Sequence, residues 1–418
     1  MTAFQICAVF LLLIAGVGWV NARWLRLPNG VAMLLAGGAA PAFLPLLDGA
    51  IPQLHLMAGL SALVRGVDFS RIVLNSLLAF LLFAGAMQVD FGEMRRQRLS
   101  VFSLATLGVF ASTAIVGLGA WAGARLLGLD LPLPWAIVFG ALISPTDPIA
   151  VVATVKRGEL SPRLKAVLQG EALFNDGVGI VVFTAAVAFL SGTMAHGGAI
   201  IGSIVVEAAG GLALGLAAGA LAIRAMRAID DYAVEVAISL ALATGVYALA
   251  QLIHLSGPVA VVGAGLLFGD TKAAAAMSET SRVYLRGFWT LVDEILNALL
   301  FLLLGLELLV VRFTPLDVLL SLVVIPLVLL ARFVVVAPWG AYFGKVKSER
   351  GATRLLVWGG LHGALSLALA LTLPEGPARA LVLSTTYATV VFSVVAQGLT
   401  FTVLVRRLAG AGEQAAAL

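Results

Sequence analysis

The residues SPTDP, at positions 144–148, interrupt an apolar run that is otherwise long enough to cross a membrane. The next apolar run contains the residues GEALFNDG, at positions 170–177. Together the two stretches place three carboxylates, Asp147, Glu171 and Asp176, where a spanning helix would lie at bilayer depth. An ionisable group there costs about 2.5–3.5 kcal/mol on insertion scales, so such groups usually mark an ion or proton pathway. The two stretches therefore predict a site inside a membrane where a cation and a proton compete.

The composition is that of an integral membrane protein. Of the 418 residues, 61% are hydrophobic and 11% are charged, whereas ordinary globular domains are about 25% charged. The single cysteine, Cys7, excludes a disulfide framework and a cysteine-ligated metal site. The chain contains no GxxxxGKS/T motif and no GxGxxG motif that opens a βαβ unit. We therefore expect no nucleotide and no cofactor, and transport driven by an ion gradient.

About thirteen apolar segments are long enough to span the hydrocarbon core of a bilayer. Most of the 26 Lys and Arg residues fall in the connections on one side of this arrangement, which the positive-inside rule assigns to the cytoplasm. The predicted orientation in the cell membrane therefore has the N-terminus outside and the C-terminus in the cytoplasm. The predicted segments lie near residues 4–20, 29–47, 72–89, 100–124, 134–155, 166–190, 199–223, 233–253, 256–271, 288–311, 316–343, 355–373 and 380–405.

The segments within 100–190 are expected to correspond to those within 316–405. In each triplet the middle segment carries an interruption, SPTDP in the first and GGLHG (359–363) in the second. Interrupted helices at corresponding positions of two halves indicate a transporter's midplane site, and three spans per unit make the repeat inverted. The predicted fold is an all-α polytopic membrane protein, an inverted repeat with two broken helices crossing in the core.

The first interruption predicts an oxygen-lined cation site. Pro145 and Pro148 remove backbone donors and so leave carbonyl groups free. Free carbonyls at membrane depth are tolerated only where they line a cavity or contact protein. With the hydroxyl of Thr146 and the carboxylate of Asp147, they form a hard-oxygen environment that suits a small alkali cation. The alternative is a proline-kinked helix with a structural aspartate.

The following segment predicts the group that carries the ion. Glu171 and Asn175 are four residues apart and share one helix face, while Ala172 and Asp176 share the neighbouring face. Burial and a nearby carboxylate such as Asp147 both favour the protonated form of a carboxyl group. A carboxyl group that holds a proton or a cation, but not both, makes exchange obligatory. The alternative is a mutually hydrogen-bonded structural pair of acids.

Two basic residues within apolar segments require partners. Arg332 keeps its charge, and its expected partners are Asp147 and Glu171. His362 lies in the second interruption and is expected either to pair with Glu171 or to serve as a packing residue. The acidic pair at 293–294 lies near the start of a segment and is expected at the membrane interface.

These motifs resemble the NhaP/NHE-type sodium/proton antiporters of the first monovalent cation–proton antiporter family. The resemblance implies a homodimer of thirteen-span subunits. It also implies that Asn175 and Asp176 form the Asn-Asp pair of electroneutral one-for-one exchangers, with Asp176 carrying the cation or the proton. The matching residues are SPTDPIAVV (144–152), GEALFNDGVG (170–179), the segment 288–307, Ala331-Arg332 and GGLHGALSLA (359–368).

The resemblance also implies a division into two domains. The moving core would comprise 100–190 (spans 4–6) and 316–408 (spans 11–13). The dimerisation domain would comprise 1–99 (spans 1–3) and 191–315 (spans 7–10). Residues 409–418 would form a short cytoplasmic tail.

Three residues depart from the family's pattern. Ala172 stands where the family commonly has serine, and Ala84 stands where many prokaryotic members have an acid. His362 replaces the arginine of a Gly-Leu-Arg-Gly motif, which implies a Glu171–His362 pair in place of a buried Glu–Arg pair. Fewer oxygen ligands leave K⁺ and Li⁺ open beside Na⁺ as the exchanged cation.

The expected function is a secondary antiporter that exchanges Na⁺, K⁺ or Li⁺ for H⁺, and not an enzyme. Its expected partners are these ions, membrane lipid and a second subunit, with no nucleic acid. One alternative is a K⁺-preferring antiporter, and another is a channel-like or sensory protein that has lost coupled exchange. A third is an intramembrane hydrolase that uses Asp147 and Asp176 as an aspartyl dyad, but the asparagine beside Asp176 and the prolines around Asp147 argue against it.

Overall fold

The computed structural model shows a helical protein. Within the residues it describes there is no β-strand, and eight helices are long and apolar enough to cross a membrane. These observations confirm the prediction of an all-α polytopic membrane protein. The described residues are 3–50, 60, 73–147, 160–192, 197–269, 277–309, 311, 313–346, 349 and 351–416.

Each of the thirteen predicted segments overlaps either a continuous helix or a helix with an interruption. The number of helices that cross the membrane and the inverted repeat stay predictions. The first half contains α1 (Ala3–Val20), η1 (Asn21–Leu25), α2 (Asn29–Ala50), η3 (Val73–Leu77), α5 (Leu78–Gln88), α6 (Phe91–Arg96), α7 (Arg98–Ser103), η4 (Leu104–Gly108), α8 (Val109–Leu126), α9 (Leu133–Ile143) and α11 (Pro162–Leu190). The second half contains α12 (Gly197–Met226), α13 (Tyr232–Leu252), α14 (Gly257–Gly269), α16 (Glu279–Leu306), η5 (Glu307–Leu309), α17 (Pro315–Val346), α18 (Ala352–Trp358), α19 (Ala364–Leu371), α20 (Arg379–Phe392), η6 (Ser393–Gln397) and α21 (Gly398–Ala416).

The helix that carries Asp176 begins at a cap encoded in the sequence. The side chain of Ser161 accepts a hydrogen bond from the backbone N–H of Leu164 at 3.2 Å, which satisfies one of the donors left unpaired at a helix start. Pro162 follows as the first helical residue, where its missing N–H costs nothing. These residues fix the start of α11, and so the register of the acidic residues that follow along it.

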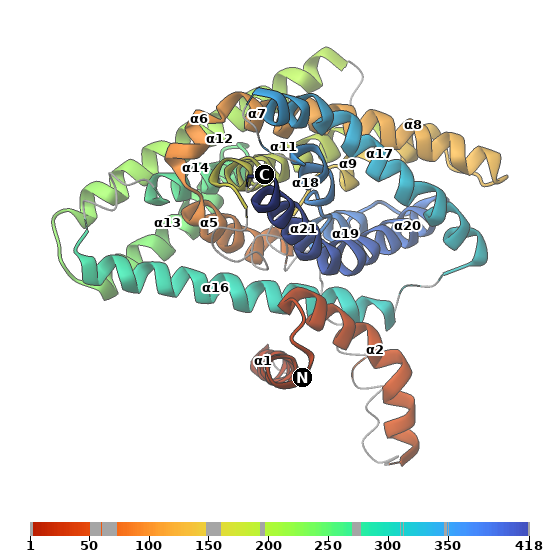
Figure 1. The fold of residues 1–418 in the computed structure, drawn as a ribbon, viewed down its shortest axis with the longest axis horizontal. Helices are drawn as coiled ribbons and strands as arrows, with labels where there is room; N and C mark the ends of the chain where they lie inside the picture. The colour runs from red at the N-terminus through yellow and green to blue at the C-terminus, as the bar shows by residue number, and fades with distance from the viewer. Residues whose placement is uncertain are drawn as a thin grey trace.

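Glycines allow the helices to approach closely. Figure 1 shows α16 along one edge of the molecule, with α1 and α2 outside it and the other helices on its opposite side. A Cβ atom at Gly37 of α2 would lie 2.5 Å from the carbonyl oxygen of Leu302, and one at Gly305 of α16 would collide with the carbonyl of Leu34. Small residues permit such contact between helix backbones, as is typical of helices in lipid.

The largest cluster of buried apolar side chains surrounds the end of α9. Leu142 and Ile143, the last residues of α9, are fully buried there, together with Leu367 of α19 and Leu304 of α16. A close-packed interior holds its neighbours in fixed positions. The cluster therefore holds the first interruption, which starts immediately after Ile143, against helices from the second half of the chain.

Candidate functional site

The two interruptions are hydrogen-bonded to each other. The backbone N–H of Asp147 donates to the carbonyl of Leu361 at 2.6 Å, and the ring Nδ1 of His362 lies 3.1 Å from the carbonyl oxygen of Pro145. Irregular backbone at membrane depth must find such partners within the protein. Each interruption therefore provides hydrogen-bond partners for polar groups of the other. Pro148 lies outside the described residues.

A π-helical turn supports the second interruption. The backbone N–H of His362 donates to Oγ of Ser393 at 2.8 Å, and that hydroxyl donates to Oε1 of Gln397 at 2.6 Å. Both side chains belong to η6 and are fully buried. This chain of hydrogen bonds fixes the backbone at His362. It thereby also fixes the carbonyl of Leu361, which accepts the hydrogen bond from the backbone N–H of Asp147.

Asn175 links α11 to the first interruption. Its Nδ2 donates to Oγ1 of Thr146 at 2.8 Å, and both residues are buried. Its Oδ1 is buried and accepts no hydrogen bond from the described part of the protein. A buried polar atom without a partner is uncommon and calls for a structural or functional reason.

A buried ion pair joins α11 to α17. The guanidinium of Arg332 contacts the carboxylate of Glu171 with both terminal nitrogens, and the Nη2–Oε2 distance is 2.9 Å. Its Nε donates to the carbonyl of Leu356 at 3.1 Å. A Cβ atom at Gly360 would collide with this guanidinium, so the glycine leaves room for the arginine to reach α11.

The pair corrects one expectation and confirms another. Glu171 was expected to pair with His362 in place of an arginine, and this prediction is wrong, because the imidazole ring contacts the carbonyl of Pro145 instead. The expectation that Arg332 pairs with Glu171 is confirmed. Arginine forms two parallel bonds to a carboxylate. The positive charge that offsets Glu171 therefore comes from Arg332 in α17 and not from His362 in the second interruption.

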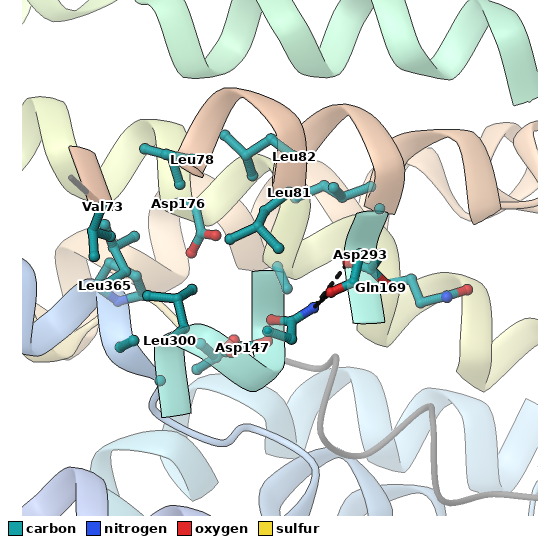
Figure 2. A pocket seen from close by; sticks show the side chains of 18 of the residues that line it. Val73, Leu78, Leu81, Leu82, Asp147, Gln169, Asp176, Asp293, Leu300 and Leu365 are labelled. Atoms are coloured by element: carbon teal, nitrogen blue, oxygen red, sulfur yellow. Dashed lines mark hydrogen bonds between the residues drawn. The ribbon is translucent and has the colours of Figure 1, made fainter. Parts of the chain in front are cut away.

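Asp147 and Asp176 line a common cavity of about 260 Å³, as do Thr146 and Ala172. Figure 2 shows the carboxylate of Asp176 directed into this space, with leucines of α5 on the far side of it. The structure thus brings together two acids that lie in different segments of the sequence. Ala172 also lines the cavity, and its methyl group contributes no oxygen atom to the cavity wall.

The cavity follows one face of α11. Lys165, Gln169, Ala172 and Asp176 all line it, at a spacing that places them along a single helix face. Lys165 is exposed, as is Gln88 of α5, which also lines the cavity. At 1.5 Å per residue, the path from Lys165 to Asp176 is about 16 Å long. The cavity therefore runs from an open end near the start of α11 to the middle of that helix.

Asp293 is a residue of this cavity that the sequence did not reveal. It was expected at the membrane interface, but its side chain is 9% exposed and lines the cavity beside Gln169 (Figure 2). The sequence did not predict this burial against the cavity, and the depth of Asp293 in the bilayer stays a prediction; its neighbour Glu294 is exposed. Asn297 lies four residues further along the same helix face, so a polar pair at that spacing was the available signal.

The fold and the site together define a class, the helical membrane transporters whose carboxylates lie beside interrupted helices. The chain belongs to the sodium/hydrogen exchanger family, because the model of that family, described as "Sodium/hydrogen exchanger, transmembrane", matches residues 9–407.

Individual relatives agree with this assignment. The chain is 39% identical over 413 residues to the Na⁺/H⁺ antiporter NhaP of Pseudomonas aeruginosa, which covers 97% of this chain and 96% of the relative. It is 35% identical to the Na⁺/H⁺ antiporter NhaH of Halobacillus aidingensis, over 93% of both chains. Among solved structures, the sodium/proton antiporter MjNhaP1 of Methanocaldococcus jannaschii has the same fold, with a TM-score of 0.74, 20% identity and coverage of 98% of this chain and all of the other.

Proposed function

We propose that the protein is a secondary antiporter that exchanges Na⁺ for H⁺ across the cell membrane at a single site centred on Asp176. The observation that carries the proposal is that Asp147 and Asp176 line one internal cavity with an open end. Two carboxylates at bilayer depth need a cation or protons to offset their charge. The relatives named as Na⁺/H⁺ antiporters support Na⁺ as the first cation to test.

The cation would be held by oxygen atoms alone. Asp147, Asp176 and the hydroxyl of Thr146 line the cavity, and Asn175 lies against Thr146 with its Oδ1 unpaired. Carboxylate, hydroxyl and amide oxygens are the ligands that hard cations prefer. Because Ala172 supplies no oxygen, K⁺ and Li⁺ are tested beside Na⁺.

Exchange follows from competition at one carboxyl group. A carboxylate that holds a cation has no proton, and a protonated one does not hold a cation. Since Asn175 is neutral, Asp176 is the only acid of the Asn-Asp pair, and one cation would leave for each proton that arrives. The proposed exchange is therefore electroneutral.

The proposed movement is that of a core against a dimerisation domain, in a homodimer. Residues 100–190 and 316–408 would move as one body, which the Glu171–Arg332 pair and the contact between His362 and Pro145 would hold together. Residues 1–99 and 191–315 would stay in place. In the orientation that the basic residues predict, the open end of the cavity faces the cytoplasm, and movement of the core would expose the same site outside.

The test uses purified protein in liposomes that contain a pH-sensitive dye. With an imposed proton gradient, Na⁺, K⁺ and Li⁺ are added in turn to the wild type, to Asp176→Asn and to Asp130→Asn, in which an exposed acid between α8 and α9 is neutralised in the same way. We expect cation-dependent alkalinisation with the wild type and Asp130→Asn, and a loss of at least a hundredfold with Asp176→Asn.

The other outcomes separate the alternatives. A response to K⁺ that exceeds the response to Na⁺ identifies a K⁺-preferring antiporter. Full activity of Asp176→Asn removes that residue from the mechanism. No response of the wild type to any ion at pH 6–9 rejects coupled exchange and favours a channel-like or sensory protein.

A further inference from the structure

We propose that Asp293 is a second cation-binding residue, which captures the ion at the open end of the cavity before it reaches Asp147 and Asp176. The inference rests on the exchange function proposed above. It assigns a role to a carboxylate in α16, a helix that contributes neither interruption and that lies outside the proposed moving core.

The contacts of Asp293 hold its carboxylate in place without neutralising it. Nε2 of Gln88 in α5 donates to Oδ2 at 3.1 Å, and Nδ2 of Asn297 donates to Oδ1 at 2.9 Å. Both donors are neutral amides, and none of the salt bridges found among the described residues involves Asp293. Each carboxylate oxygen has further acceptor capacity, so the group remains able to bind a cation.

The position of Asp293 is on the way to the two inner acids. It lines the same cavity as Asp147 and Asp176, and Figure 2 shows it beside Gln169, with Asp176 at the opposite end of the space. Gln88, its hydrogen-bond partner, is exposed. An ion that enters at the open end therefore meets Asp293 first, while the ion is still partly hydrated. It reaches Asp176 only after it has moved further into the cavity.

The charges of the cavity favour such a relay. Asp147, Asp176 and Asp293 line one cavity, so the three acids share one negative field, and walls of leucine concentrate that field in the cavity. Lys165, the basic side chain that lines the cavity, is exposed at its open end, where water screens its charge. A cation at Asp293 would thus be drawn inward by the other two carboxylates.

A loading residue has a kinetic signature that a structural residue lacks. Neutralising Asp293 should raise the KM for the cation on the side of the open end about tenfold, and the maximal rate from that side should stay within about twofold. The KM on the opposite side should not change. The exchange equilibrium does not depend on the protein, so the ratio of maximal rate to KM must change by the same factor on both sides. With an unchanged KM on the opposite side, the maximal rate from that side should therefore also fall about tenfold. A misfolded site would instead lower both maximal rates.

The experiment compares everted and right-side-out membrane vesicles that contain the wild type, Asp293→Asn or Glu294→Gln. The last variant removes an exposed acid from the neighbouring position of the same helix and should behave like the wild type. Asp293→Glu, which restores the charge, should recover most of the affinity. Should Asp293→Asn not fold, Asp293→Ser removes the same charge with a smaller side chain and takes its place.

The results distinguish this inference from the proposed function. If the wild type exchanges ions and neutral variants at 293 keep its KM on both sides, Asp293 is not a loading residue, although the exchange proposal stands. Equal KM increases for Asp293→Asn and Glu294→Gln would also overturn the inference, because a general surface charge would then explain the effect. A wild type without exchange rejects the proposed function, and the inference with it.

Discussion

At the scale of single residues, Glu171 and Arg332 form a buried ion pair whose charges must offset each other. Both side chains are almost fully buried, and removing a charge from water costs several kcal/mol unless a partner offsets it. The Nε bond to the carbonyl of Leu356 ties the same guanidinium to the helix before the second interruption. One arginine thereby joins α11, α17 and α18.

Removing the arginine should therefore destabilise the protein strongly. We expect Arg332→Ala to lower the free energy of unfolding by about 3–5 kcal/mol, because it leaves the Glu171 carboxylate buried without a partner. The double variant Glu171→Leu/Arg332→Met should recover part of this loss, since it leaves no unpaired charge. Thermal unfolding in detergent measures both effects.

The matched control is the exposed pair Arg282–Glu279 at the start of α16. Its removal by Arg282→Ala should leave the unfolding temperature almost unchanged, because exposed pairs contribute little. An Arg332→Ala protein as stable as the wild type would show that the pair does not hold the core together.

At the scale of elements, the site depends on how closely the two interruptions approach. A Cβ atom at Gly363 would lie 2.5 Å from Oδ2 of Asp147. The backbone of Gly363 is extended, with φ −113° and ψ −163°, so an alanine is compatible with its conformation and only the contact with Asp147 opposes it. The second interruption thus sets the position of the carboxylate in the first.

The substitution Gly363→Ala should displace the Asp147 carboxylate while the fold is retained. We expect the KM for the cation to rise at least tenfold in the liposome assay, because ligand oxygens must stay within a few tenths of an ångström to bind a cation. Gly245→Ala in α13 is the control, since a Cβ atom there meets nothing within 4 Å. A wild-type KM for Gly363→Ala would mean that Asp147 does not coordinate the ion.

At the scale of the whole molecule, the basic residues predict which side of the membrane each connection faces. The distribution of Lys and Arg predicts that the connection between α8 and α9 lies outside and that the connection between α12 and α13 lies in the cytoplasm. Asp130 and Asp230 are exposed in these two connections. They therefore provide labelling positions on opposite sides.

Single cysteines test this orientation in a Cys7→Ser background. In intact cells, a membrane-impermeant maleimide should label Asp130→Cys and should label Asp230→Cys only after the membrane is permeabilised. The reverse pattern would invert the topology and would place the open end of the cavity outside. Equal labelling of both positions in intact cells would contradict the odd number of spans between them.

Much of this protein can be read from its sequence, because the relevant signals are local. Hydropathy determines which segments are apolar helices, since a chain in lipid must satisfy its own backbone hydrogen bonds. Prolines and glycines mark where two of those helices are interrupted. The order of the apolar segments places Asp147 and Asp176 in neighbouring segments. The sequence also identifies the family, and the structure then shows the two acids in one cavity.

The tertiary structure alone decided which side chains meet. Glu171 and Arg332 are 161 positions apart, and the choice between Arg332 and His362 depends on the rotation and depth of α17 relative to α11, which no local pattern encodes. For the same reason the sequence did not predict that Asp293 lines the cavity, since its surroundings come from α5 and α11. Apolar periodicity orients each helix towards the protein or the lipid, but packing between distant helices determines the partners of its polar groups.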